Sequence, residues 1–306
     1  MRVIVAGLGV QGCKRRTHAG ASFVASVDPV NPEAGFRDLS EIPLKDYDAV
    51  ILSVPDEPKF NLVRYCLFNS KHVLVEKPLW TTHNEQITEL ERLAQQNNVV
   101  CYTAYNHRFE PHFIRMRDLI GSGDLGRIYS CRMFYGNGTA RLVRDSLWRD
   151  QGAGVLTDLG SHLLDTCSFL FGTDLGSFSL QSAHRFENRA LDHVVVSSEY
   201  LEPRIELEMT LCMWRNHFTC DVLGEKGTAH IKSLCKWGPS TFIHRTRVFP
   251  SGRPIEKRIE LVQSDPTWTL EYLHFENLAA TNTTTDLSQD LKLQSNLRRL
   301  GAEVTR

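Results

Sequence analysis

The sequence lacks any C-x-x-C pair, although eight cysteines are spread over its 306 residues. Disulfide frameworks belong to short chains with closely spaced cysteines, so this scatter favours reduced, mostly buried thiols in a cytoplasmic protein. No group of histidines and cysteines has metal-ligand spacing, because Cys101, His107 and His112 are placed too irregularly. We therefore expect no metal site, and a zinc enzyme is the least favoured function.

The sequence also lacks an excess of either positive or negative charge. The 35 basic residues nearly balance the 36 acidic ones, and the net charge is −1. Nucleic acids and anionic membranes attract basic patches, so we expect neither as the main partner. The balance also leaves little net repulsion against self-association.

Long apolar runs are missing as well. No run approaches the roughly 20 residues that a membrane-spanning helix needs. The apolar stretch at residues 3–5 is too short for the core of a signal peptide. At about 150 residues per domain, the length predicts two domains. The expectation is a two-domain cytoplasmic protein.

Five short apolar runs do occur in the first hundred residues, separated by polar, helix-like stretches. They do not alternate with polar residues, which is typical of strands covered on both faces in a parallel sheet. One intervening stretch, 84–97, carries Ile87, Leu90 and Leu93 at helical spacing. This alternation predicts a doubly wound parallel α/β domain of the Rossmann type over residues 1–107. The five runs are 3–6, 23–27, 49–54, 72–75 and 99–102.

A glycine-rich G-x-G-x-x-G segment follows the first run. Its first glycine permits a tight turn, its second lets the backbone approach a pyrophosphate, and its third lets the next helix pack on the strand. The free N–H groups at the start of that helix would face the anion. The residues assigned to this dinucleotide site are Gly7, Gly9, Val10, Gln11 and Gly12.

An aspartate, Asp28, ends the second run, 21 positions after Gly7. A carboxylate at this place accepts hydrogen bonds from the ribose hydroxyls of the adenosine and repels a 2′-phosphate. NAD is therefore favoured as the cofactor, with NADP left open. Lys14, Arg15 and Arg16 are interpreted either as phosphate ligands or as the solvated side of the helix.

Further site residues lie where later strands end, because open α/β sheets bind ligands at the carboxyl ends of their strands. Lys77 is also assigned to catalysis: its ammonium would stabilise the alkoxide as hydride leaves a carbinol carbon. Pro78 fixes the backbone after it, and the alternative for this Glu-Lys-Pro is a surface turn. The residues assigned to the cofactor site at this edge are Ser53, Pro55, Glu76, Lys77 and Asn106.

The pattern changes after residue 107. Helices are predicted over 110–120, 155–171 and 286–300, and a turn over 224–227. Apolar residues alternate with polar ones over 205–213, which indicates an antiparallel or mixed sheet with one buried face. Residues 108–306 are therefore predicted to form a second, α+β domain.

Polar residues share one face of the helix predicted over 155–171. Asp158, His162 and Asp165 are spaced by four and three positions, opposite an apolar stripe. His162 is the candidate base for a hydroxyl proton, since histidine titrates near neutral pH. Asp158 would orient the imidazole or hold a substrate hydroxyl. The alternative is a plain solvated face.

Four segments together resemble the glucose–fructose oxidoreductase, inositol dehydrogenase and MocA (Gfo/Idh/MocA) family. They are the glycine loop, Glu76-Lys77-Pro78, the Asn-His-Arg-Phe at 106–109, and 152–165. The resemblance implies that a Rossmann domain is followed by a domain with a large open, mostly antiparallel sheet. It implies that Lys77, Asp158 and His162 are the catalytic residues. It also implies a carbohydrate-like substrate and a homodimer or homotetramer formed through that sheet.

The sequence departs from the family at residues 29–48. Family members usually carry a full helix between the second and third strands, and in this chain we expect that helix to be shortened or lost. Other candidate pocket residues stay open, since they serve equally well as strand faces of a dimer interface. They are His184, Asp192 and Trp214, whereas the resemblance places Asn137 and Arg149 near the expected pocket. The function predicted is an NAD(P)-dependent dehydrogenase or reductase acting on a sugar, cyclitol or nucleotide-sugar-like alcohol or ketone. The alternative is a dinucleotide-binding sensor without turnover.

Overall fold

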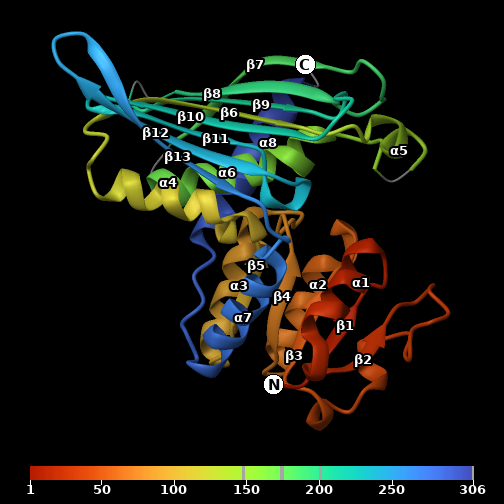
Figure 1. The fold of residues 1–306 in the computed structure, drawn as a ribbon. Helices are drawn as coiled ribbons and strands as arrows, with labels where there is room; N and C mark the ends of the chain where they lie inside the picture. Colours follow the sequence, from red (N-terminus) through yellow and green to blue (C-terminus); the bar gives the residue numbers. More distant parts are fainter. Residues whose placement is uncertain (147–148, 173–175, 200–201, 305–306) are drawn as a thin grey trace. The chain divides into compact units, whose positions relative to one another are not determined.

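The computed structural model describes residues 1–146, 149–172, 176–199 and 202–304 (Figure 1). The chain divides into two compact units, and each is described by itself. The first unit comprises Met1–Asn106 and Thr267–Gln294; the second comprises His107–Pro266 and Ser295–Arg306. Residues 267–294, which lie within the predicted second domain of 108–306, pack into the first unit instead.

The first unit is built on a parallel five-stranded sheet in the order β2-β1-β3-β4-β5. Successive side chains of β1 serve opposite faces of the sheet: Val3 and Val5 join one apolar cluster, and Ile4 joins the other. Both faces are therefore buried, which explains why the runs lack polar alternation. The strands are β1 (Val3–Ala6), β2 (Phe23–Val27), β3 (Ala49–Leu52), β4 (His72–Glu76) and β5 (Cys101–Ala104).

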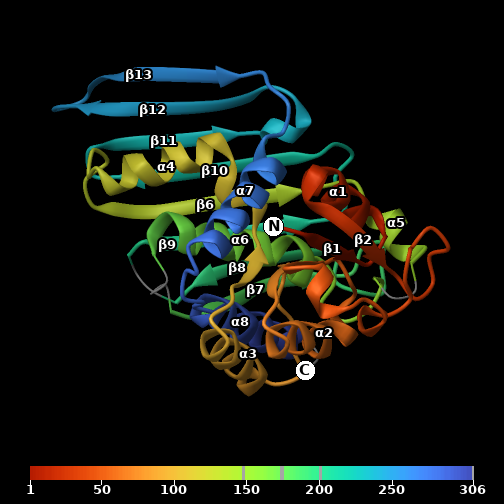
Figure 2. The ribbon, with the colours of Figure 1, turned by 90° about the horizontal axis from the view of Figure 1, so that it is seen from below.

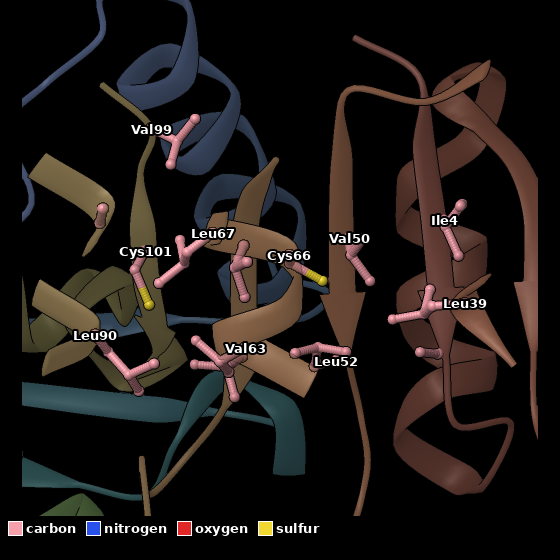
Figure 3. Close-up of a cluster of buried hydrophobic side chains, with 14 of the residues drawn as sticks. Ile4, Leu39, Val50, Leu52, Val63, Cys66, Leu67, Leu90, Val99 and Cys101 are labelled. Carbon is pink, nitrogen blue, oxygen red and sulfur yellow. The ribbon is translucent and has the colours of Figure 1, made fainter. Parts of the chain in front are cut away.

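Helices cover the two faces of this sheet. On one face, Val63 of α2 and Leu90 of α3 pack with Val50 and Leu52 (Figure 3). On the other face, α1 and α7 lie together, and α7 contributes the buried Phe275. The helices are α1 (Val10–Ala19), α2 (Asp56–Phe68), α3 (Asn84–Gln96), α7 (Thr267–Ala280) and α8 (Ser288–Val304), whose residues divide between the two units.

The connection between β2 and β3 departs from the usual doubly wound plan, as predicted. Residues 28–48 contain only two 3-10 turns, Leu39–Glu41 and Leu44–Asp46. Phe36 makes a single parallel bridge to Val27. In the usual order 3-2-1-4-5-6 a full strand occupies that edge, so this chain lacks the strand as well as the helix.

The second unit is built on an eight-stranded sheet in the order β13-β12-β11-β10-β6-β9-β8-β7 (Figure 2). Only the pairing of β6 with β9 is parallel, so the predicted large, mostly antiparallel sheet is confirmed. The strands are β6 (Ile128–Gly136), β7 (Phe178–His184), β8 (His193–Ser198), β9 (Arg204–Thr210), β10 (His217–Gly224), β11 (Gly227–Lys232), β12 (Ser240–Val248) and β13 (Gly252–Leu261).

Helices α4 (Pro111–Gly121) and α6 (Val155–Phe171) lie on one face of this sheet, and the short α5 (Ala140–Arg144) follows β6 (Figure 1). The period-two pattern explains the arrangement, because Ile205 and Leu207 of β9 are fully buried while Glu206 between them is partly exposed. No helix in the described parts of the chain is long and apolar enough to cross a lipid bilayer.

Candidate active site

The glycine loop joins β1 to α1 and is too tight for side chains at two positions. Gly7 has φ +87°, and a Cβ there would lie 2.3 Å from the carbonyl oxygen of Ser53. A Cβ on Gly12 would lie 1.7 Å from the carbonyl oxygen of Gly7. Around Gly9, in contrast, a Cβ would meet no atom within 4 Å. The loop therefore packs closely on the sheet and leaves its outer side open at Gly9.

The start of α1 is suited to an anion. Gly9 occupies the N-cap without a side-chain hydrogen bond, and the first turn carries no acidic residue. Val10 and Gln11 are exposed there. The first N–H groups of a helix have no partner within the helix and carry partial positive charge. This arrangement fits the pyrophosphate of a dinucleotide.

Asp28 braces this loop through both carboxylate oxygens. Oδ2 accepts the N–H of Leu8 at 2.7 Å, and Oδ1 accepts those of Val30 and Asn31 at 2.9 and 2.8 Å. Burial raises the pKa of Asp28, but these three bonds and the charge of Arg37 outweigh it and hold the pKa below its usual value. A carboxylate has about four acceptor sites. Asp28 therefore stays ionised and keeps room for about one further hydrogen bond.

Arg15 is neither a phosphate ligand nor part of a solvated helix face, the two interpretations given for the basic residues 14–16. Its side chain is 1% exposed, and it donates from Nε to Glu76 Oε1 at 2.7 Å and from Nη1 to Glu271 Oε2 at 2.6 Å. The ring of Trp268 lies 4.4 Å from its guanidinium carbon. Arg15 is thus the centre of a buried ionic group that ties α1 to β4 and α7. No local sequence pattern indicates this role, because both acidic partners are distant along the chain.

The carboxyl end of β4 carries the Glu-Lys-Pro segment, in which the Lys77–Pro78 peptide is cis. Lys77 is partly buried. The carboxylate of Glu76, which the sequence assigns to the cofactor site, accepts from Arg15. Beside this segment lies Lys59 of α2, which is 1% exposed. Its Nζ donates to Asp56 Oδ1 at 2.6 Å and to the carbonyl of Pro78 at 2.7 Å.

The remaining predicted cofactor residues occupy the same edge of the sheet. Ser53 lies against Gly7 and Gly12, and its buried Oγ has no hydrogen-bond partner in the described part of the chain. Pro55 is the exposed N-cap residue of α2. Asn106 donates from Nδ2 to Thr267 Oγ1 at 2.8 Å, which ties the end of the Rossmann strands to α7.

In the second unit, Asp158 and His162 occupy one face of α6 and are partly exposed. Asp158 Oδ2 lies 3.7 Å from Nη2 of Arg149. Asp165 does not share this exposed face, because it is fully buried and bound by the guanidinium of Arg108, with Nε to Oδ2 at 3.0 Å. Burial raises the pKa of Asp165, and the charge of Arg108 opposes that shift. Asp165 thus anchors the segment at 106–109 to α6.

Aromatic rings surround His162. The imidazole of His107 stacks on it with centroids 4.1 Å apart and an interplanar angle of 19°. Tyr135 of β6 lies 6.1 Å from His162 and 5.5 Å from His107. Nζ of Lys236 donates to the hydroxyl of Tyr135 at 3.1 Å. This aromatic group is not predicted from the sequence, in which the histidine of the Asn-His-Arg-Phe segment is its one signal.

Most other candidate pocket residues of the second unit have structural contacts. Asp192 is fully buried and accepts the backbone N–H groups of residues 186–188. His184 stacks on Phe186, and Asn137 accepts from Thr139. Trp214 is fully exposed. A cavity of about 670 Å³ lies close to the start of α6; its polar lining comprises Arg144, Asp150, Gln151, Glu187, Asn188 and Arg189.

Both units match family models. Residues 6–105 match the model described as the oxidoreductase family with an NAD-binding Rossmann fold, and residues 113–230 match the Gfo/Idh/MocA C-terminal domain. These features define a Rossmann-type, dinucleotide-binding class of protein. The chain belongs to the Gfo/Idh/MocA family.

Curated relatives match over parts of the chain. An uncharacterized oxidoreductase of Schizosaccharomyces pombe is 35% identical over 41% of this chain and 34% of its own length. The scyllo-inositol 2-dehydrogenase (NADP(+)) IolW of Bacillus subtilis is 28% identical over 50% of this chain and 43% of its own. The NAD(+)-dependent scyllo-inositol 2-dehydrogenase of the same organism is 27% identical over 58% and 56%. The chain thus spans about a third to three fifths of the length of these relatives.

Solved structures share the fold over nearly the full chain. Levoglucosan dehydrogenase in complex with NADH superposes with a TM-score of 0.82, at 17% identity, over 99% of this chain and 97% of that one. An oxidoreductase from Agrobacterium radiobacter with NAD+, L-tartaric acid and magnesium gives a TM-score of 0.81, at 14% identity, over the same shares. At these identities the likeness establishes the fold.

Proposed function

We propose that this protein is an NAD(P)-dependent oxidoreductase. It would transfer a hydride between the nicotinamide and a carbinol or ketone carbon of a sugar, cyclitol or nucleotide-sugar-like substrate. The observation that carries the proposal is the glycine loop, open at Gly9 and braced by the ionised Asp28, in a chain of this family. The names of the inositol and levoglucosan dehydrogenases support the substrate class.

The proposed chemistry uses three side chains. The glycine loop and Asp28 would hold the dinucleotide, whose nicotinamide would supply the acceptor for the hydride of the carbinol carbon. His162 takes the hydroxyl proton. General-base catalysis by a positioned imidazole raises the reaction rate by about 10²–10⁴-fold. Lys77 stabilises the negative charge that develops on the same oxygen. Asp158 orients the imidazole or holds a neighbouring hydroxyl. In the reverse direction His162 returns the proton and Lys77 polarises the carbonyl.

The contacts within the second unit support the role of His162. Its ring is held by the stacked His107, and its helix is anchored by the Asp165–Arg108 ion pair. A fixed ring direction favours proton transfer, because reactive geometry depends on orientation as well as distance. The polar cavity at Asp150 and Asn188 offers the hydrogen-bonding groups that a polyhydroxylated substrate needs.

For the cofactor we propose NAD, with NADP as the second choice. Asp28 keeps its negative charge and one acceptor site for a ribose hydroxyl, and that charge opposes a 2′-phosphate. A fluorescence titration would compare NADH with NADPH in the wild type and in Asp28→Ser. We expect tighter binding of NADH by the wild type, and a smaller preference in the variant. Equal affinities in the wild type would contradict this choice.

We propose that the Rossmann sheet within residues 1–107 serves the cofactor, and that the second unit, within residues 108–306, serves the substrate and self-association. The face of the second sheet opposite α4 and α6 carries cross-strand polar contacts. Arg132 Nε lies 2.8 Å from Glu206 as an ion pair, and His230 Nδ1 lies 2.6 Å from Asp221 Oδ1. Such a row suits a homodimer or homotetramer formed face to face. Light scattering, which measures the molar mass in solution, tests this proposed assembly in the wild type and in Arg132→Glu. A monomeric wild type would refute the assembly.

The activity itself is tested by measuring NAD reduction over a panel of sugars, cyclitols and their phosphates. We expect turnover with at least one of them. Lys77→Ala and His162→Ala should each lower kcat by about 10²-fold or more, while the dissociation constant of NADH changes little. Wild-type turnover in both variants would remove the mechanism. NADH binding without turnover on any substrate would indicate a dinucleotide sensor.

A further inference from the structure

Lys59 is a buried charged residue that the proposed chemistry does not use. It lies on the first turn of α2, and its side chain is only 2% exposed. Burying an ammonium costs several kcal/mol unless it is paired and hydrogen-bonded. Asp56 supplies the opposite charge at 2.6 Å, from a side chain that is itself 51% exposed. An apolar side chain would fill the same space without that cost, so the charge itself requires an explanation.

The second bond of Lys59 indicates what the charge does. Its Nζ donates to the carbonyl of Pro78 at 2.7 Å, which is one residue beyond Lys77. The charged groups around this ammonium are Asp56, Glu76 and Lys77. Glu76 is itself fixed by Arg15. The backbone on either side of Lys77 is therefore tied to buried cations, by Arg15 through Glu76 and by Lys59 through Pro78.

A second lysine makes the same kind of contact at the opposite end of β4. Lys71 Nζ donates to the carbonyls of Leu44 and Tyr47 at 2.6 and 2.8 Å, and lies 4.9 Å from the centroid of the Tyr47 ring. Lys71 thus stabilises the amino end of β4, away from the edge where open α/β sheets bind ligands. It provides a matched control for Lys59.

We propose that Lys59 is a positioning residue for Lys77: it fixes the Pro78 carbonyl and thereby the backbone that directs the Lys77 side chain. This inference rests on the proposed function, in which the Lys77 ammonium stabilises the reacting oxygen. A misplacement of about 1 Å in such a group costs about 10²-fold in rate. Lys59 itself does not touch the substrate; it acts through the carbonyl of Pro78, the residue that follows Lys77.

The test compares Lys59→Met with Lys71→Met. Both changes remove an ammonium and its carbonyl bonds while keeping an unbranched side chain of similar length. We expect kcat of Lys59→Met to fall about 10- to 100-fold, with the KM for NAD and the dissociation constant of NADH within about twofold of wild type. In Lys71→Met the melting temperature falls and kcat stays at the wild-type value.

Asp56→Asn serves as the second variant if Lys59→Met does not fold. It keeps an acceptor for Lys59 but removes the counter-charge from an exposed position, and a smaller loss of kcat, about three- to tenfold, is expected. Wild-type kcat in a folded Lys59→Met overturns the inference, and so does an equal loss of kcat in both lysine variants. If Lys59→Met does not fold, wild-type kcat in Asp56→Asn overturns it. A wild type without turnover overturns the proposed function instead.

Discussion

Each of the two units holds its own group of candidate site residues, and the two groups are built by different means. In the first unit the site consists of backbone: a glycine loop, a helix start and strand ends, braced by Asp28, Arg15 and Lys59. In the second unit it consists of side chains from separate elements, with His162 on α6 stacked against His107 and beside Tyr135 of β6. A backbone site is specified by a short local motif, whereas a side-chain site depends on long-range packing.

The largest effect is expected from the buried ionic group of the first unit. Arg15→Met leaves Glu76 and Glu271 buried without their cation, and breaking such a pair costs about 3–5 kcal/mol. Urea unfolding measures this loss. Arg16→Met, at the next and more exposed position, should change stability by less than about 0.5 kcal/mol. Equal effects of the two substitutions would show that the group at Arg15 does not stabilise the unit.

Two glycine variants separate folding from cofactor binding in the backbone site. Gly12→Ala places a Cβ 1.7 Å from a carbonyl oxygen, so both the melting temperature and NADH affinity should fall. Gly9→Ala meets no protein atom within 4 Å, so its melting temperature should stay at the wild-type value. Its NADH affinity should fall about tenfold, or about 1.4 kcal/mol. Unchanged affinity in Gly9→Ala would show that the dinucleotide does not approach this loop.

Substitutions of two buried histidines separate folding from catalysis in the second unit. His107→Leu removes the ring stacked on His162, and kcat should fall about tenfold while NADH binding is unchanged. His112→Leu is the control, because His112 is also buried but packs near Phe242 instead. It should lower the melting temperature without lowering kcat. A drop in NADH affinity for His107→Leu would contradict the division between the two units.

The smallest effect is expected at the amino edge of the first sheet, away from the candidate site residues of either unit. Hydrogen bonds from Arg2 lower the pKa of Asp48 to about 2. A depressed folded-state pKa stabilises the fold above the unfolded value of about 3.9, and this contribution is lost as the pH falls towards 2. Because the pair is half-exposed, less than about 1 kcal/mol is expected.

Urea unfolding of Asp48→Asn and wild type across pH 6 to pH 2 measures this contribution. The difference between them should shrink as the pH falls, and NADH affinity at pH 7 should be equal. A difference that grows on acidification would contradict the assigned charge state.

The sequence predicted most of the backbone and little of the side-chain packing. All five strands of the first sheet were found, although β5 begins two residues later than its apolar run suggested. The helix over 155–171 matched α6. In contrast, α7 is not predicted, since no local pattern shows that a helix beginning at Thr267, far beyond the last Rossmann strand at Cys101–Ala104, packs on the Rossmann sheet. For the same reason the sequence does not reveal the partners of Arg15. Asp165 is predicted to share a polar face with Asp158 and His162, and its burial against Arg108 is not apparent because the two residues are far apart along the chain.

The central claim is that Lys77 and His162 serve one reaction, and a double-mutant cycle on kcat tests it most directly. Groups that act as a unit have non-additive effects, so Lys77→Ala/His162→Ala should be about as slow as the slower single variant. Rate losses that multiply in the double variant would contradict the account.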